Sequence, residues 1–203
     1  MPRNRAFNQD EVVHKAMITF WRQGYSATSL KDLEHATGLT TGSLYNSFNG
    51  KEQLFATCVR HYIESVVGKR INEHLVDENP LDGLRSYAQE IVRALGDTRY
   101  TGCLLLDAHR ELAQLSPDVA RIIRRGQRRL DKAIHGSFER AARDGTLGPH
   151  ADTKATSRQY GLMLAGLLAN NRRFGHADRK DALRAIDVFL QGLRQAGPAG
   201  ESN

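Results

Sequence analysis

The chain has 203 residues, of which 40% are hydrophobic and 26% charged, and it carries a formal net charge of +6 at pH 7. These proportions are ordinary for a globular protein with a sizeable core. No apolar run reaches the roughly 18 residues of a membrane span, and the first residues lack the apolar core of a signal peptide. With only two cysteines, Cys58 and Cys103, a disulfide scaffold is not expected and a cytoplasmic location is the default.

The positive charge favours a polyanionic partner, but it is spread along the chain. Residues 1–51 hold six Lys or Arg and four Asp or Glu, so they carry only +2 of the +6. Arg3 and Arg5 precede the first predicted helix, where they suit either a basic arm in a minor groove or a solvated tail. A prediction of DNA binding must therefore rest on residue pattern rather than on bulk charge.

Two short-range patterns predict helices near the N-terminus. Over residues 9–23, apolar side chains recur at spacings of three and four, and Asn8 can cap the helix start. Further on, Leu30 and Leu33 supply the apolar face of a second, short helix. Gly38 follows at the position where such a helix would stop in a left-handed cap.

A third predicted helix carries the candidate contacts to DNA. Thr40 can act as its N-cap, while Leu44 and Phe48 point inward. The outward positions are then Thr41, Gly42, Ser43, Tyr45 and Asn46. Small polar residues, one tyrosine and one amide suit a helix that enters a DNA groove. The two short helices therefore predict a helix-turn-helix whose second helix lies in the major groove; the alternative is an ordinary helical hairpin with an exposed polar face.

Side-chain chemistry separates the expected base contacts from the expected phosphate contacts. Ser43 and Asn46 are expected to read base edges, because an amide can pair bidentately with adenine. Thr41 suits a thymine methyl group or a phosphate, and the Tyr45 hydroxyl suits the DNA backbone. Helix starts offer free N–H groups to phosphates. The complete set of expected DNA-binding residues is Thr28, Ser29, Thr40, Thr41, Gly42, Ser43, Tyr45, Asn46 and Lys51.

Residues 20–55 also contain many residue types at fixed spacing. They are Phe20, Gly24 and Tyr25, then Thr28–Ser29, Gly38, Gly42-Ser43-Leu44-Tyr45, Phe48 and Lys51-Glu52-Gln53-Leu54-Phe55. This pattern resembles the TetR family of bacterial transcriptional regulators. That family often has Lys where Thr41 stands and His where Asn46 stands, so the resemblance does not carry an operator preference over to this chain.

Helical spacing of apolar residues continues to the C-terminal region. The predicted helices cover 51–76, 81–96, 105–115, 117–144, 153–174 and 179–195, and the tail 197–203 is expected to fray. No segment alternates with a period of two, so no sheet is expected. The predicted fold class is all-α with about nine helices. Residues 1–50 would form a three-helix helix-turn-helix DNA-binding domain, and residues 51–203 a helical ligand-binding and dimerisation domain.

The resemblance implies a transcriptional regulator, in particular a ligand- or stress-responsive repressor that releases a palindromic operator when an effector binds. Its expected partners are double-stranded operator DNA, a second copy of the chain and a small-molecule effector that the sequence does not name. Small residues in 153–174 and the apolar face of 179–195 suit a four-helix bundle between two copies, or closure of the monomer core. Activation instead of repression, or action through a protein partner, stays open.

Cys103 is a candidate sensor of oxidants or electrophiles. It follows Gly102 at an expected helix start, where the helix dipole lowers a thiol pKa. Some regulators of the resembled family carry a Gly-Cys-Leu motif at a similar place, and here the match is Gly102-Cys103-Leu104. The alternative is a small, inert core residue. Cys58 lies on an apolar stripe and is expected in the core.

The remaining motifs do not indicate catalysis. No phosphate loop, zinc-protease motif or nucleophile elbow is present, so we expect neither an enzyme nor a cofactor. His135 and Glu139 have a spacing of four but no third ligand nearby, so no metal site is expected. A stripe of cations follows one helix face, at Arg121, Arg125, Arg128 and Lys132. A solvated face explains it better than an anion-binding surface.

Overall fold

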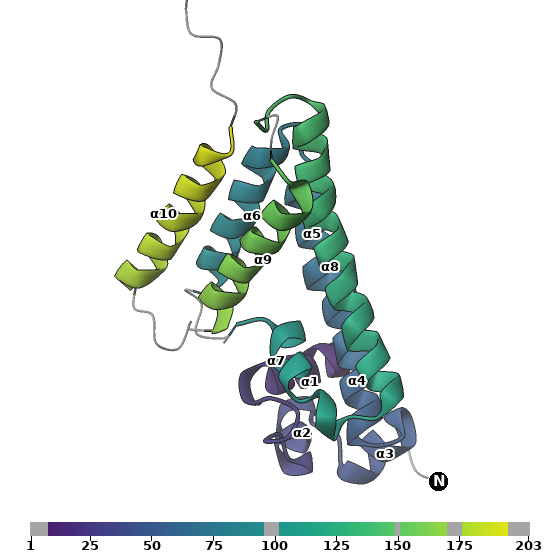
Figure 1. Cartoon of the computed structure of the whole chain (residues 1–203). Coiled ribbons are helices and arrows are strands. Elements are labelled where there is room, and N and C mark those ends of the chain that lie inside the picture. Colours follow the sequence, from purple (N-terminus) through teal and green to yellow (C-terminus); the bar gives the residue numbers. More distant parts are fainter. Residues whose placement is uncertain (1–7, 96–101, 149–150, 170–175, 195–203) are drawn as a thin grey trace, which may run out of the picture. The chain divides into compact units, whose positions relative to one another are not determined.

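The structure is a computed structural model of the chain and describes residues 8–95, 102–148, 151–169 and 176–194 (Figure 1). These residues contain helices, turns and one isolated bridge between Leu147 and Arg194, and no β-strand. The helices are α1 (Gln9–Gln23), α2 (Leu30–Thr37), α3 (Thr41–Phe48), α4 (Lys51–Tyr62), α5 (Lys69–His74), α6 (Pro80–Leu95), α7 (Leu104–Arg110), α8 (Pro117–Arg143), α9 (Thr153–Ala169) and α10 (His176–Gly192). The predicted all-α class is confirmed.

A six-residue π-helix, η1 (Ile63–Gly68), joins α4 and α5 into one continuous helix. Among the described residues this leaves nine continuous α-helical segments, as the sequence predicts. A regular helix would place Val66 on the buried stripe after Tyr62, but Val67 is buried instead. The reason is the wider π turn, in which residues five apart rather than four apart face the same side.

Packing divides the chain into two compact units. Unit 1 comprises residues 1–67 and 98–127, and unit 2 comprises residues 68–97 and 128–203. Unit 1 therefore contains α7 and the first part of α8 in addition to the predicted helix-turn-helix. The functional boundary that we predict near residue 50 concerns DNA contact rather than packing, and it stays a prediction.

Aromatic side chains form the centre of unit 1. Phe20 lies 4.9 Å from Phe55 between ring centroids, and Trp21 lies 4.8 Å from Tyr62. All four are buried because α1 packs along α4. The Trp21 indole N–H donates to the Gly102 carbonyl at 3.2 Å, which ties the segment before α7 to α1.

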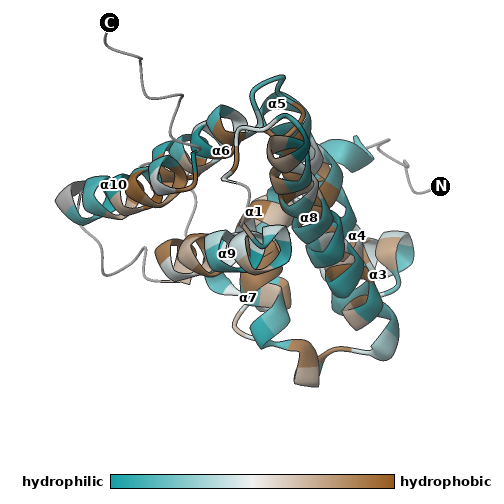
Figure 2. Cartoon of the chain, turned by 45° about the horizontal axis from the view of Figure 1, so that its top comes forward, coloured by the Kyte–Doolittle hydropathy of each residue, from teal (hydrophilic) through white to brown (hydrophobic). Residues whose placement is uncertain are grey.

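Aliphatic side chains dominate the centre of unit 2, where α6 packs against α5 and α10. Figure 2 shows apolar residues on α6, α9 and α10 and hydrophilic residues along much of α8. Tyr160 is fully buried there and its hydroxyl donates to the Leu84 carbonyl at 2.6 Å. Gly83 allows a close approach, because a Cβ at this position would stand 2.2 Å from the His74 carbonyl oxygen.

Two predicted element boundaries differ from the structure. The segment 105–115 is not one helix: α7 ends at Arg110 and a 3-10 turn, η2 (Leu112–Gln114), follows it. The last helix begins at His176, three residues before the predicted start. The end of the helix predicted to residue 174, the tail 197–203, Arg3 and Arg5 lie outside the described residues. In the described parts, no helix is long and apolar enough to cross a membrane.

Candidate nucleic-acid interface

Helix α2 is delimited by side-chain and backbone caps. The Ser29 hydroxyl accepts the Asp32 N–H at 3.1 Å, and the Asp32 carboxylate accepts the Ser29 N–H at 2.8 Å, which completes a capping box. The Ser29 hydroxyl, 2.6 Å from the Asp32 carboxylate, and then the Ser29 N–H lower the pKa of Asp32. At the other end Gly38 has a φ of +75°, the left-handed conformation that the sequence predicts for the helix stop.

Helix α3 begins where the sequence predicts. The Thr40 hydroxyl accepts the Ser43 N–H at 3.2 Å as the N-cap, while Leu44 and Phe48 are buried. The Glu34 carboxylate on α2 accepts the Thr41 N–H, and the Thr41 hydroxyl together with this N–H lowers the pKa of Glu34. The turn between α2 and α3 is therefore closed by a direct bond from one helix to the first N–H of the next.

Helix α3 presents a polar face that no described residue covers. Gly42, Tyr45 and Asn46 are exposed, with the Tyr45 side chain 49% accessible, and Thr41 and Ser43 are partly exposed. Thr40 and Ser29 are exposed at the two helix starts. The structure thus brings Ser29 and the α3 residues into one compact helix-turn-helix, with side chains that can donate and accept hydrogen bonds.

Thr28 departs from its expected outward position. Its side chain is only 1% accessible, and its hydroxyl donates to the Gly24 carbonyl at 2.6 Å. The hydroxyl points inward because the sharp turn between α1 and α2 brings the Gly24 carbonyl within hydrogen-bonding distance. The Thr28 hydroxyl therefore holds the turn in this structure, and DNA contact at this helix start through backbone N–H groups stays a prediction.

Lys51 stands at the first position of α4 with its ammonium group 4.5 Å from the Tyr25 ring centroid. Partial burial lowers the pKa of Lys51, and attraction to Glu111 and Asp32 opposes that shift. The ring and the two carboxylates hold the ammonium group close to the start of α4. A cation held in that place can meet a phosphate without ordering a free side chain.

Several structural residues of this surface were missed from sequence. Asn49, with a φ of +58°, ends α3 in the left-handed conformation, and Gly50 follows with a φ of +100°. The Asn-Gly pair is itself a turn signal that could have predicted this stop. Glu111 and Glu52 also bind backbone N–H groups near the surface, but no local pattern indicates contacts between residues so far apart in the chain.

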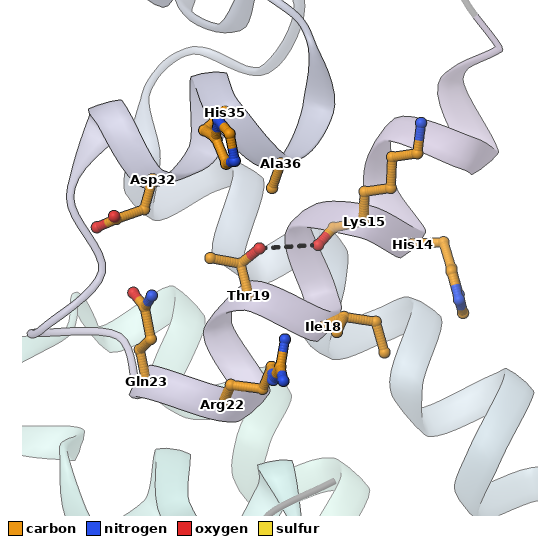
Figure 3. A pocket seen from close by; sticks show the side chains of 9 residues that line it. All are labelled: His14, Lys15, Ile18, Thr19, Arg22, Gln23, Asp32, His35 and Ala36. Carbon is orange, nitrogen blue, oxygen red and sulfur yellow. Dashed lines mark hydrogen bonds between the residues drawn. The ribbon is translucent and has the colours of Figure 1, made fainter. Parts of the chain in front are cut away.

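A shallow groove of about 430 Å³ lies between α1 and α2 within unit 1 (Figure 3). Seven of the nine residues that line it are polar or charged: His14, Lys15, Thr19, Arg22, Gln23, Asp32 and His35, beside Ile18 and Ala36. Figure 3 shows the Thr19 hydroxyl bonded to the Lys15 carbonyl, at 3.0 Å. Lys15 is itself paired with Glu11 at 2.6 Å. This open groove does not enclose a ligand as an ordinary small-molecule site does.

The two cysteines have different surroundings. Cys58 is fully buried, and burial raises the pKa of its thiol, so it is the core residue that the sequence predicts. Cys103 is partly exposed at the N-cap of α7, and the Tyr62 hydroxyl donates to its sulfur at 3.6 Å. In the described parts of the chain, no group of three or more His, Cys, Asp or Glu side chains could hold a metal ion.

Comparison with known proteins decides the family. The profile of bacterial regulatory proteins of the TetR family matches residues 12–58, which include most of α1 and all of α2 and α3. The HTH-type transcriptional regulator YezE of Bacillus subtilis is 31% identical over 160 residues, spanning 78% of this chain and 82% of YezE. The chain belongs to the TetR family. It is a DNA-binding transcriptional regulator, and its partner is DNA.

Two further TetR-family comparisons extend over most of the chain. The HTH-type transcriptional repressor ComR of Escherichia coli is 27% identical over 173 residues, covering 84% of this chain and 82% of ComR. A cysteine mutant of the TetR-family regulator CifR, solved in complex with 26-bp double-stranded operator DNA, superposes with a TM-score of 0.79. It is 25% identical and the match covers 93% of this chain and 98% of CifR. The similarity therefore extends well beyond the helix-turn-helix.

Proposed function

We propose that this TetR-family regulator is a repressor that binds a palindromic operator through α3 and releases it when an effector binds. The observation that carries the proposal is the exposed polar face of α3 on a helix-turn-helix that is capped at each end. Ser43 and Asn46 read base edges, Tyr45 contacts the backbone, and Ser29, Thr40, Thr41, Gly42 and Lys51 hold phosphates. The DNA-binding domain extends to about residue 50.

A second copy of the chain is the expected protein partner. Leu162 on α9 and Val188 on α10 are 68% and 62% exposed, although both are large and apolar. A Cβ added at Gly161 or Gly166 would meet nothing within 4 Å. An apolar face with small residues permits close approach of another pair of helices, and a two-fold dimer matches the symmetry of a palindromic operator. Residues 51–203 then carry dimerisation and effector binding.

Release follows from a population shift between two arrangements of the dimer. The effector must bind the arrangement that fits DNA poorly more tightly than the one that fits it well. Each recognition helix then meets its major groove at the wrong separation, and operator affinity falls. Such a regulator acts in the cytoplasm and catalyses no reaction.

Footprinting of the purified protein on DNA flanking its own gene tests this proposal. A protected, roughly palindromic stretch that overlaps the promoter is the expected result. Protection upstream of the promoter would favour activation instead, and protection that needs an added protein would favour a partner-dependent regulator. Absence of any sequence preference in selection from random DNA would contradict the proposal.

Thiol chemistry at Cys103 is a second candidate for the effector response. Its partial exposure and the Tyr62 hydroxyl at 3.6 Å favour it over Cys58, which is buried. An electrophilic enone would form a carbon–sulfur bond at Cys103, and its α carbon would take the thiol proton. Cys103→Ser is expected to abolish the response and to keep basal operator binding. A response that persists in this variant excludes Cys103 as the sensor.

A further inference from the structure

The turn between α1 and α2 is held by a carboxylate from far along the chain. The Glu111 Oε1 atom accepts the Tyr25 N–H at 3.0 Å, and Oε2 accepts the Ser26 N–H at 2.7 Å. The Ser26 hydroxyl also contacts the Glu111 carboxylate and the Gln114 amide oxygen. Both oxygens of Glu111 are therefore used on the backbone of a single turn, and charge-assisted bonds of this kind are the stronger ones.

Gly24 makes room for this carboxylate. A Cβ at Gly24 would stand 2.7 Å from Glu111 Oε1, and its φ of +87° also disfavours any other residue. Thr28 closes the same turn from within by its bond to the Gly24 carbonyl. The backbone of this turn is thus shaped to accommodate the Glu111 carboxylate, and the contact is more than a chance approach to an exposed loop.

The segment 111–116 is tied to the DNA-reading end at a second point. The Glu52 carboxylate, in the first turn of α4, accepts the Ser116 N–H at 2.6 Å. Ser116 directly precedes α8. Glu111 therefore binds backbone N–H groups of the turn between α1 and α2, and Glu52 binds the N–H of Ser116. All of these residues lie within unit 1. We call Glu111, Gln114, Ser116 and Glu52, with the turn 24–28, the carboxylate clasp.

The carboxylate clasp is connected to Lys51 through Tyr25. The Tyr25 backbone is bound by Glu111, the Tyr25 ring packs 4.9 Å from the Phe55 ring, and the same ring carries the Lys51 ammonium group. Displacement of Glu111 would free the Tyr25 backbone and remove a negative charge that attracts Lys51. Ser29, the N-cap of α2, follows the same turn.

We propose that Glu111 is a positioning residue for operator binding, which acts through Tyr25 to hold Lys51 and the start of α2 where they meet phosphates. This inference rests on the proposed function, since it assumes that these helix starts face DNA. It places a determinant of operator affinity in the segment after α7, about 60 residues beyond the end of α3. Any event that moves this segment would change DNA binding.

Glu111→Gln tests the proposal, with Asp118→Asn as the matched control. Both remove one negative charge from the same stretch of chain, but Asp118 is exposed and paired only locally with Arg121 at 2.8 Å. The probe is the duplex recovered by selection from random DNA with the wild-type protein, compared with a scrambled duplex of equal length. Failure of the wild-type protein to select any sequence would contradict the proposed function, whereas the outcomes below concern Glu111 alone.

For Glu111→Gln we expect roughly tenfold weaker operator binding and a comparable loss on the scrambled duplex, because phosphate contacts carry no sequence information. The slope of log affinity against log salt should fall by about 0.9, the value for one lost phosphate contact. Lys51→Ala should lower the slope equally, and the double variant should bind no worse than Lys51→Ala alone. Asp118→Asn should stay within about twofold of the wild-type protein.

Two results would overturn the proposal: operator affinity of Glu111→Gln equal to that of Asp118→Asn, or full additivity of the Glu111 and Lys51 substitutions. Circular dichroism establishes that each variant is folded at the assay temperature. Should Glu111→Gln not fold, Glu52→Ala opens the clasp from the other side. The same loss of operator binding is then expected, and unchanged operator affinity would overturn the proposal.

Discussion

The two units of this protein are stabilised in different ways. Unit 1 joins distant segments through aromatic packing and through carboxylates that bind backbone N–H groups, as at Glu111 and Glu52. Unit 2 relies on aliphatic packing around α6, and its long-range bonds link side chains to one another or to backbone carbonyls, as from Arg85 to Asp187 at 2.8 Å and from Tyr160 to Leu84. Hydrogen bonds define where each group lies, whereas apolar burial is tolerant of direction. In the unit that must present groups to DNA, such bonds hold the backbone of a turn.

The largest expected effects come from removing a buried aromatic ring from the core of each unit in turn. Phe138→Ala in unit 2 and Phe55→Ala in unit 1 should each cost about 3–5 kcal/mol, because both rings are fully buried. Each should lower a melting temperature by about 10 °C. Calorimetry is the measurement: if the units unfold separately, the two substitutions shift different transitions. A single unfolding transition that both substitutions shift equally would contradict the separate stabilisation of the two units.

A charge on the exposed apolar face of unit 2 should dissociate the proposed dimer. Leu162→Glu would place a charge on the proposed interface of each copy, and we expect dimerisation to weaken by at least about 2 kcal/mol. Analytical ultracentrifugation measures this directly. Glu139→Gln, on the exposed side of α8, is the control and should leave the association state unchanged. A Leu162→Glu protein that sediments as the wild-type dimer would place the interface elsewhere.

Substitution on α3 should affect DNA binding without affecting stability. Asn46→Ala is expected to lose about 1–3 kcal/mol of operator binding, a 5- to 150-fold effect, because a bidentate base contact disappears. Fluorescence anisotropy with operator and scrambled duplexes gives the affinities. Ser47→Ala, at an exposed neighbouring position that we assign no contact, provides the comparison. Equal affinities for the two variants would show that α3 is docked differently.

Alkaline pH should distinguish the two units by the pH at which stability begins to fall. Burial raises the folded-state pKa of both the Cys58 thiol in unit 1 and the Tyr160 hydroxyl in unit 2. Each neutral form is favoured in the folded state, so its stability is complete below the unfolded pKa and is lost as pH rises above it. The unfolded pKa is about 8.5 for Cys and about 10 for Tyr.

Unit 1 is therefore expected to weaken first, by up to about 1.4 kcal/mol per pH unit above pH 8.5. Denaturant titrations between neutral pH and pH 10 measure this slope. Cys58→Ala removes the ionisable group and should flatten the slope for unit 1, while Cys103→Ser should leave it unchanged. A slope that survives in Cys58→Ala would assign the effect to another group.

The smallest expected effect concerns the buried hydroxyl of unit 2. Tyr160→Phe removes the bond to the Leu84 carbonyl but keeps the ring, so the expected cost is about 1 kcal/mol. Thermal unfolding should show a decrease of a few degrees. A cost as large as that of Phe138→Ala would mean that unit 2 depends on this hydrogen bond as much as on apolar burial, contrary to the difference drawn from unit 1.

Local sequence alone determined most of the helices and the helix-turn-helix. The caps at Asn8, Ser29, Gly38 and Thr40 lie where their chemistry predicts, because a cap is a contact between residues only a few positions apart. The apolar spacing of α1, α6 and α8 likewise reports which helix face is buried. The family resemblance of residues 20–55 supplied the function that the polar face of α3 by itself left open.

Only the tertiary structure decided the features that local pattern does not carry. The π-helical turn at Ile63–Gly68 exchanges Val66 for Val67 in the core, and Glu111 binds the turn between α1 and α2. The Glu111 contact arises because chain segments far apart in sequence pack together, and helical periodicity carries no information about such pairs. The carboxylate that we infer to position the DNA-reading surface therefore belongs to a segment that no local motif distinguishes.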